Sequence, residues 1–310
     1  MSTTGSAATA PPSTGTVALL SVPRGVSEIF FQSNVWTGLL ILAAFVVADW
    51  RMALLVLVGA LASTAAGALL RVGTDSVSTG MQGFNGALVG AAVFTALGAQ
   101  GWAWLVTLVA GLLCGPVTWC FVKIFASRPL ARFALPSTTA PFCTVAGVMY
   151  VATTSLHVTS ASRPVDDGTG GSFLRSLLTN VSEVVLVNSV WAGALILLGL
   201  FVASWKVGLA AVMGSVVGSL CAFALGETDS TIEQGLAGYS GVLTAIALSV
   251  VFLRSSTASW VYAVVGTAVT AVVTVVMTNL YGGPHYTWPY ILTTWVFLVV
   301  AAFVPALRRP

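Results

Sequence analysis

The chain has 310 residues, of which 57% are hydrophobic and only 7% are charged. A soluble domain carries about 25% charged residues, so this composition excludes a water-soluble globular protein and indicates one solvated by lipid. The formal net charge of +3 is too small to indicate a nucleic-acid partner, and we expect none.

The chain opens on a polar segment. Residues 1–22 are rich in Ser, Thr, Ala and Pro, which predicts a disordered tail. The earliest basic residue, Arg24, follows the first apolar run instead of preceding it, so we expect no signal peptide.

An internal repeat with an offset of 155 is the strongest pattern in the sequence. Residues 27–50 read SEIFFQSNVWTGLLILAAFVVADW, and residues 182–205 read SEVVLVNSVWAGALILLGLFVASW. Matches in this order over more than a hundred residues predict a duplicated unit, as is common in transporters and channels. Two further pairs follow in the same order: GFNGAL at 83–88 with GYSGVL at 238–243, and LPSTTAPF at 135–142 with GPHYTWPY at 283–290.

We expect five membrane-spanning helices in each half, because about 20 apolar residues cross a bilayer. A short apolar piece at 27–33 or 182–188 precedes the first span of each half. It either extends that helix or forms a re-entrant half-helix, and the sequence leaves both possibilities open. The expected spans are 34–49, 52–70, 83–99, 102–122 and 137–154 in the first half, and 189–204, 207–225, 238–253, 258–280 and 288–306 in the second.

Five spans is an odd number, so the second half must enter the membrane in the opposite orientation to the first. With the N-terminus in the cytoplasm, nine of the twelve Lys and Arg residues lie in cytoplasmic segments, as the positive-inside rule requires. We therefore expect both termini in the cytoplasm. The expected domains are a disordered cytoplasmic tail (1–22), a first pore half (23–154), an extracellular linker (155–181) and a second pore half (182–310).

Two acidic residues, Glu28 and Glu183, occupy equivalent places before the first span of each half. A carboxyl group within a membrane is costly and usually serves a site, so each is a candidate acceptor at a pore mouth or a coupling-ion site. Each could instead be an N-cap that stabilises the first turn of a helix, and Ser27 and Ser182 fit that role.

Aromatic and hydroxyl side chains recur beside helix-breaking residues. Phe84 and Tyr239 each lie between glycines, which let a backbone approach closely or bend. A flat ring on such a backbone could form a rigid side of a narrow slot. Thr139 and Thr287 lie beside prolines. Their hydroxyls could satisfy freed backbone groups or line a polar stripe at mid-membrane.

Histidine and cysteine residues form no recognisable site. His157 and His285 have no counterpart in the other half, and we interpret them as structural. The spacing of the cysteines fits no metal site, and no catalytic triad or phosphate-binding loop is present, so we expect no metal, no cofactor and no enzyme. All four cysteines lie in apolar segments and are expected to be buried free thiols: Cys114, Cys120, Cys143 and Cys221.

Together these motifs resemble those of the urea transporter family, over about residues 20–306. The family's hallmarks are a twice-occurring G-[YF]-N-G-like motif and a twice-occurring L-P-x-x-T-x-P-F motif, which stand here as GFNG with GYSG and as LPSTTAPF with GPHYTWPY. The resemblance implies an all-α integral membrane protein of two inverted homologous halves, each with five transmembrane helices and a re-entrant half-helix. It also implies a homotrimer with one pore through each protomer.

The resemblance further implies which residues line that pore. Two slots flank a central constriction, and hydrogen-bond acceptors run between them. By position, Phe31 and Phe84 serve one slot, Leu186 and Tyr239 serve the other, Leu88 and Leu243 narrow the pore, Thr139 and Thr287 lie near its centre, and Glu28 and Glu183 begin the acceptor ladders.

The second half departs from the family pattern. It has Ser240 where Asn is expected and Leu186 where an aromatic would match Phe31, and its last motif lacks both the leading Leu and the Phe. These changes could widen the second slot or alter its selectivity toward other small amides.

We expect a passive channel that moves urea down its gradient across the cell membrane. A proton-coupled secondary transporter that uses Glu28 or Glu183 is one alternative, and a channel for other small amides or ammonia is another. Ammonia channels usually place histidines in the pore, and neither histidine here lies in a predicted span. A membrane protein that transports nothing is the remaining alternative.

Overall fold

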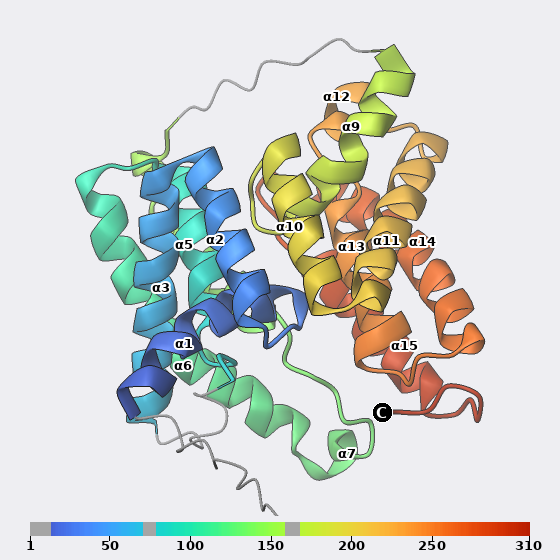
Figure 1. Cartoon of the computed structure of the whole chain (residues 1–310), viewed down its shortest axis with the longest axis horizontal. Coiled ribbons are helices and arrows are strands. Elements are labelled where there is room, and N and C mark those ends of the chain that lie inside the picture. The colour runs from blue at the N-terminus through green and yellow to red at the C-terminus, as the bar shows by residue number, and fades with distance from the viewer. Residues whose placement is uncertain (1–13, 71–78, 159–167) are drawn as a thin grey trace, which may run out of the picture.

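The computed structural model describes residues 14–70, 79–158 and 168–310, and all regular elements in these residues are helices (Figure 1). The first set comprises α1 (Thr14–Ser27), η1 (Glu28–Phe30), α2 (Val35–Ala48), α3 (Trp50–Leu69), α5 (Phe84–Leu97), α6 (Gly101–Phe125), α7 (Arg128–Ala131), α8 (Ala140–Ala152) and η2 (Thr154–Leu156). The second set comprises α9 (Gly168–Glu183), α10 (Val190–Ala203), α11 (Trp205–Ala224), α12 (Asp229–Glu233), α13 (Tyr239–Ile246), η3 (Ala247–Val251), α14 (Thr257–Leu280) and α15 (Trp288–Ala301).

Four of the described helices, α3, α6, α11 and α14, are each long and apolar enough to cross a membrane. They coincide with four of the expected spans. The other six expected spans are also helical, but α2, α5, α8, α10, α15 and the α13–η3 pair have only 13 or 14 residues each. At 1.5 Å per residue these helices are about 21 Å long, so none of them crosses a hydrocarbon core of about 30 Å alone.

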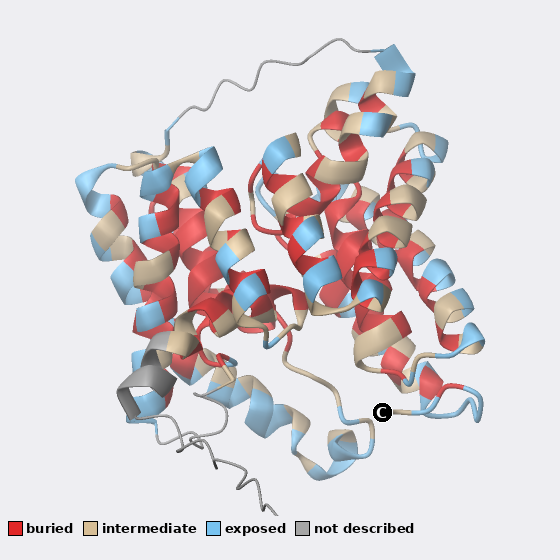
Figure 2. Ribbon diagram, viewed as in Figure 1, coloured by how far each residue is buried: buried red, intermediate tan, exposed pale blue. Residues whose placement is uncertain are grey.

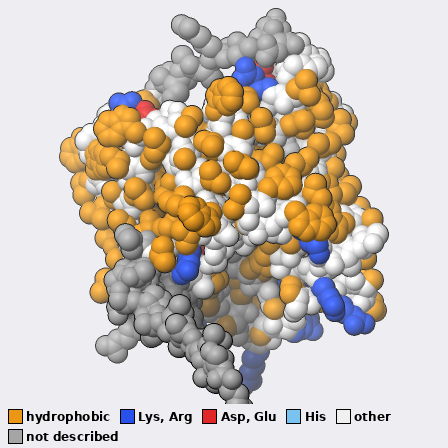
Figure 3. Space-filling view, viewed as in Figure 1, with side chains coloured by type: hydrophobic (Ala, Val, Ile, Leu, Met, Phe, Trp, Pro, Cys, Tyr) orange, Lys and Arg blue, Asp and Glu red, His pale blue; other side chains and the backbone are white. Residues whose placement is uncertain are grey.

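The outside of the molecule is apolar at mid-height. Figure 3 shows hydrophobic side chains across the middle of the visible face and basic side chains towards its two ends. Along α6, Leu105, Leu108 and Leu112 are exposed at helical spacing. The buried residues gather between the helices (Figure 2). An apolar exterior around a packed interior is the pattern of a multi-pass membrane protein.

The helices pack closely where small residues face each other. A Cβ atom added to Gly86, the second glycine of GFNG, would lie only 2.1 Å from the carbonyl oxygen of Gly59. Glycine at these positions therefore allows α3 and α5 to touch backbone to backbone, as membrane helices commonly do. The motif glycine thus serves helix packing at this point.

The longer helices of the two sets follow one another in the same order. α2 and α10 have 14 residues each, and α3 and α11 have 20 each. In Figure 1, α1 begins at the face that carries α7 and the C-terminus and runs into the molecule. α9 instead begins at the other face, beside α12. We call these the C-terminal face and the opposite face.

Two expected boundaries differ from the structure. Residues 14–22, expected in a disordered tail, belong to α1, and residues 168–181, expected in the linker, belong to α9. The buried face of α9 carries small polar residues, which is unusual for the inward face of a helix: Ser172, Ser176, Thr179 and Asn180. Residues 1–13 and 159–167 lie outside the described residues, as do Arg71 and Arg163, which we counted for orientation.

Candidate functional site

A serine holds the sharp bend between α1 and α2, whose axes differ in direction by 80°. The Ser27 hydroxyl contacts the carbonyl oxygens of Arg24 and Gln32 and accepts the N–H of Asn34 at 3.1 Å. The short piece at 27–33 is therefore no extension of α2, but the end of a separate helix followed by a turn. Ser182 does the same in the second set, where its hydroxyl accepts the N–H of Ser189 at 3.4 Å.

The two acids lie at the ends of α1 and α9, and neither directly precedes α2 or α10. Glu28 follows α1, and Glu183 is the last residue of α9. Asn34 and Ser189 cap α2 and α10 instead, since their side chains accept N–H groups of the first turns at 3.1 and 3.3 Å. The N-cap interpretation of the acids is therefore wrong. A carboxylate at a helix C-terminus faces the negative end of the helix dipole, so it does not stabilise that helix.

A cavity of about 700 Å³ opens at the C-terminal face. Glu28, Phe31, Phe84 and Thr138 line it from the first set of helices, and Phe252 lines it from the second. The rings of Phe31 and Phe252 pack edge to face with centroids 5.5 Å apart. Phe31 and Phe84 thus border the same cavity. The ring that contacts Phe31 comes from the other half of the chain, which the repeat could not reveal.

A smaller cavity, of about 260 Å³, lies at the opposite face. Leu186, Tyr286 and His157 are among the residues that line it. Tyr239 does not line it, but its hydroxyl donates to the backbone carbonyl of Tyr286, and its ring stacks on His285 at 6.2 Å. His157 therefore lines this cavity and His285 lies between two residues that line it, Pro284 and Tyr286, a placement that the sequence did not indicate because neither histidine has a counterpart in the repeat.

Two threonines meet between these cavities. The hydroxyl oxygens of Thr139 and Thr287 are 2.6 Å apart, and the thiol of Cys143 lies 3.1 Å from Thr287. Thr138 precedes Thr139 and lines the larger cavity, while Tyr286 precedes Thr287 and lines the smaller one. Each threonine of the pair therefore directly follows a residue that lines one of the two cavities, and both threonines are buried.

The threonine pair is also where two helices begin. Thr139 is the N-cap of α8 and Thr287 is the N-cap of α15, and each helix has a proline in its first turn, where the missing N–H costs nothing. Thr138 and Tyr286 before the caps have left-handed backbones, with φ of 49° and 46°. Paired left-handed conformations at non-glycine residues carry strain, which is commonly retained at functional sites.

The remaining candidates lie in the helix core. Leu88 and Leu243 are fully buried in α5 and α13, and neither lines either of the two cavities. The Asn of the first GFNG motif has a structural role, because the Asn85 side chain accepts the backbone N–H of Phe142 in the first turn of α8 at 3.1 Å. Ser240, its counterpart, has no hydrogen-bond partner, so its hydroxyl does not replace that cap.

The four cysteines are free thiols. Cys114 and Cys143 are buried as expected, and Cys221 is half-buried. Cys120 is exposed, so the expectation of burial is wrong there: it lies on the outer side of α6, where apolar sequence reflects contact with lipid. Among the described residues, no group of three or more His, Cys, Asp or Glu side chains could hold a metal ion.

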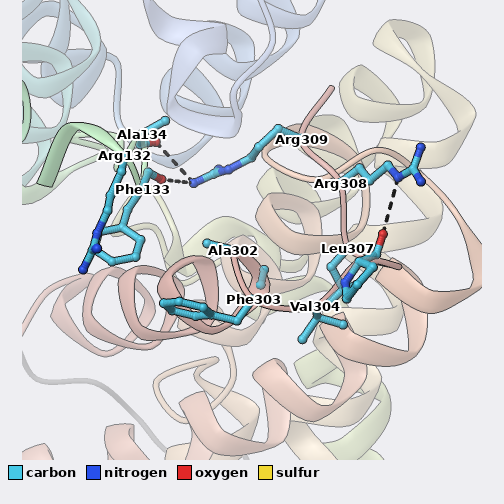
Figure 4. A pocket seen from close by; sticks show the side chains of 11 residues that line it. Arg132, Phe133, Ala134, Ala302, Phe303, Val304, Leu307, Arg308 and Arg309 are labelled. Carbon is cyan, nitrogen blue, oxygen red and sulfur yellow. Dashed lines mark hydrogen bonds between the residues drawn. The ribbon is translucent and has the colours of Figure 1, made fainter.

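The C-terminal tail borders the larger cavity. The guanidinium of Arg309 donates to the carbonyl oxygens of Phe133 at 2.5 Å, Ala134 at 3.3 Å and Phe252 at 3.2 Å. Figure 4 shows the first two of these bonds across a neighbouring pocket of about 500 Å³. Ala134 and Phe252 also line the larger cavity, so Arg309 links two segments of the cavity wall by hydrogen bonds.

Residues 19–302 match the family described as "UT: Urea transporter". The chain belongs to the urea transporter family. It is 28% identical to "Urea transporter 1" of Rattus norvegicus, an alignment that covers 92% of this chain and 78% of the rat protein. It is also 28% identical to "Urea transporter 1" of Capra hircus, covering 93% of this chain and 78% of that protein. Membership places the chain among membrane transporters and not among enzymes.

Proposed function

We propose that this protein is a passive channel for urea. The path runs from the cavity at the C-terminal face, past Phe31 and Phe252, through the Thr139–Thr287 pair, to the cavity at the opposite face. The observation that carries the proposal is the buried pair of hydroxyl groups, 2.6 Å apart, between two cavities on opposite faces. The relatives named urea transporters support urea as the solute.

Urea suits such a path chemically. It is small, planar and neutral, so the rings at the larger cavity would admit it edge-on and exclude bulkier solutes. As it sheds water, its four N–H groups need acceptors, because a buried polar group without a partner is costly. The carboxylate of Glu28 and the hydroxyls of Thr139 and Thr287 supply acceptors in succession. Several weak sites in a row let a solute enter and still leave.

Two helix dipoles at the constriction would exclude cations. α8 and α15 both begin at the threonine pair, so the positive ends of their dipoles converge there. A cation would meet repulsion at the same point at which it would have to give up its water. Positive ends of short helices exclude protons and other cations in neutral-solute channels by this means. Neutral urea meets no such barrier.

The arrangement in the membrane is part of the same proposal. The two sets of helices are inverted halves of the chain, in which α1 with η1 is the re-entrant segment of the first and α9 that of the second. The opposed starts of α1 and α9 in Figure 1 support this. Five membrane-embedded helices follow in each half. The protein lies in the cell membrane with both termini in the cytoplasm, and it assembles as a homotrimer. The trimer rests on the family resemblance.

Stopped-flow light scattering on proteoliposomes tests the proposal. Urea entry above that of empty vesicles, and unchanged by a proton gradient, is the expected result. Entry that depends on the gradient would instead make Glu28 or Glu183 a proton-coupling residue. No urea entry would overturn the proposal, and formamide, acetamide, thiourea and ammonia would then be tried as solutes.

A further inference from the structure

The path described so far offers urea mainly acceptors, because the hydroxyl groups of Thr139 and Thr287 are hydrogen-bonded to each other and to the thiol of Cys143. The N–H groups find carboxylate and hydroxyl oxygens, but the carbonyl oxygen of urea needs a donor. Two of the described hydroxyl groups lie near the path and have no hydrogen-bond partner of ordinary geometry: those of Thr138 and Tyr290.

Tyr290 lies where such a donor is needed. It is on α15, three residues and so about one helical turn beyond Thr287. Its ring centroid is 6.0 Å from that of Phe31, which lines the larger cavity. The side chain is fully buried, and Thr138, which precedes the constriction residue Thr139, lines the same cavity as Phe31. Tyr290 therefore lies beside Phe31 and one helical turn from the constriction, and Thr138 lies directly before it.

The hydroxyl of Tyr290 is not needed for packing. At the equivalent place in the first half stands Phe142, a ring of the same shape that lacks the hydroxyl and is just as buried. A phenylalanine would also match the family motif, so the hydroxyl is a feature of this chain. Buried polar groups without partners are rare and need an explanation, and a passing solute supplies one.

We propose that the hydroxyl groups of Tyr290 and Thr138 form a donor site for the carbonyl oxygen of the transported amide. The inference rests on the proposed function. A tyrosine O–H donates well to a carbonyl oxygen and poorly to a thiocarbonyl sulfur. The site therefore favours urea over thiourea, which has the same planar shape and the same N–H groups.

The test compares urea and thiourea flux in proteoliposomes for the wild type and for Tyr290→Phe. The variant is expected to lower the urea-to-thiourea flux ratio about three- to tenfold, the effect of one lost hydrogen bond. Its melting temperature should stay the same or rise, since the hydroxyl has no hydrogen-bond partner within the protein. Tyr262→Phe is the matched control, because the Tyr262 hydroxyl donates to Phe297 at 2.8 Å and lies on α14 away from the path.

Thr138 provides a second, independent variant. Thr138→Val should lower the same ratio, while Thr138→Ser, which keeps the hydroxyl, should retain it. Wild-type urea flux with an unchanged ratio in both Tyr290→Phe and Thr138→Val would overturn the donor site and leave the channel intact. A melting temperature that falls in Tyr290→Phe with no change in ratio would show a structural hydroxyl instead. Absence of wild-type urea flux would overturn the proposed function and the donor site together.

Discussion

Replacing Thr287 with valine tests the centre of the proposed path. The change keeps the β-branched shape and removes one hydroxyl. That hydroxyl lies 2.6 Å from Thr139 and 3.1 Å from the thiol of Cys143, so both lose a partner. A buried hydroxyl left unpaired costs about 1–3 kcal/mol, and the protein should lose stability of that order.

Flux should fall for a related reason. Urea at the constriction would lose one hydrogen-bond partner at the point where it has the fewest, and a barrier raised by about 1–3 kcal/mol slows passage about tenfold or more. Stopped-flow urea entry into proteoliposomes measures this directly. Thr144→Val is the matched control, because that hydroxyl only donates to the Ala140 carbonyl within α8, at 2.8 Å.

The double variant Thr139→Val/Thr287→Val separates stability from transport. No hydroxyl of the pair is then left unpaired, so stability should recover towards that of the wild type. Urea flux should fall further, since both acceptors are gone. Wild-type flux in Thr287→Val, or flux that recovers together with stability in the double variant, would refute the role of this pair in transport.

Three further variants test other parts of the structure. Phe84→Ala should raise the flux of larger amides such as acetamide relative to that of urea, as measured in the same vesicles. An unchanged flux ratio would show that this ring does not select the solute. Asn85→Ala should lower the free energy of unfolding by about 1 kcal/mol through loss of the α8 cap, whereas Ser240→Ala should not, and equal losses would contradict the cap assignment. Arg309→Ala should lower the melting temperature in detergent through loss of three charge-assisted hydrogen bonds, with Arg308→Ala as the milder control.

Much of the fold was predictable from local sequence. Long apolar runs form helices in a membrane because all backbone groups must pair within the segment, and each of the ten expected spans is helical. The repeat also matched Thr139 with Thr287, and the family resemblance implied that both lie near the centre of the pore. These features depend on residues close together in the sequence or on the internal repeat.

Other features follow from contacts that no local pattern encodes. Asn34 and Ser189, not the neighbouring acids, cap α2 and α10, because the chain bends before the cap is reached. The buried face of α9 is polar, and its side chains find hydrogen-bond partners on neighbouring helices, as Ser176 and Asn180 do with Ser219 of α11.

The site itself shows the same division. The sequence alone determined a duplicated, lipid-embedded helical protein with paired carboxylates and threonines, since composition and the repeat are properties of the chain. Only the tertiary structure decided that Phe252 packs on Phe31 and that the Tyr290 hydroxyl lies unpartnered beside it. These residues lie more than two hundred positions apart along the chain, and their meeting depends on how the two halves pack.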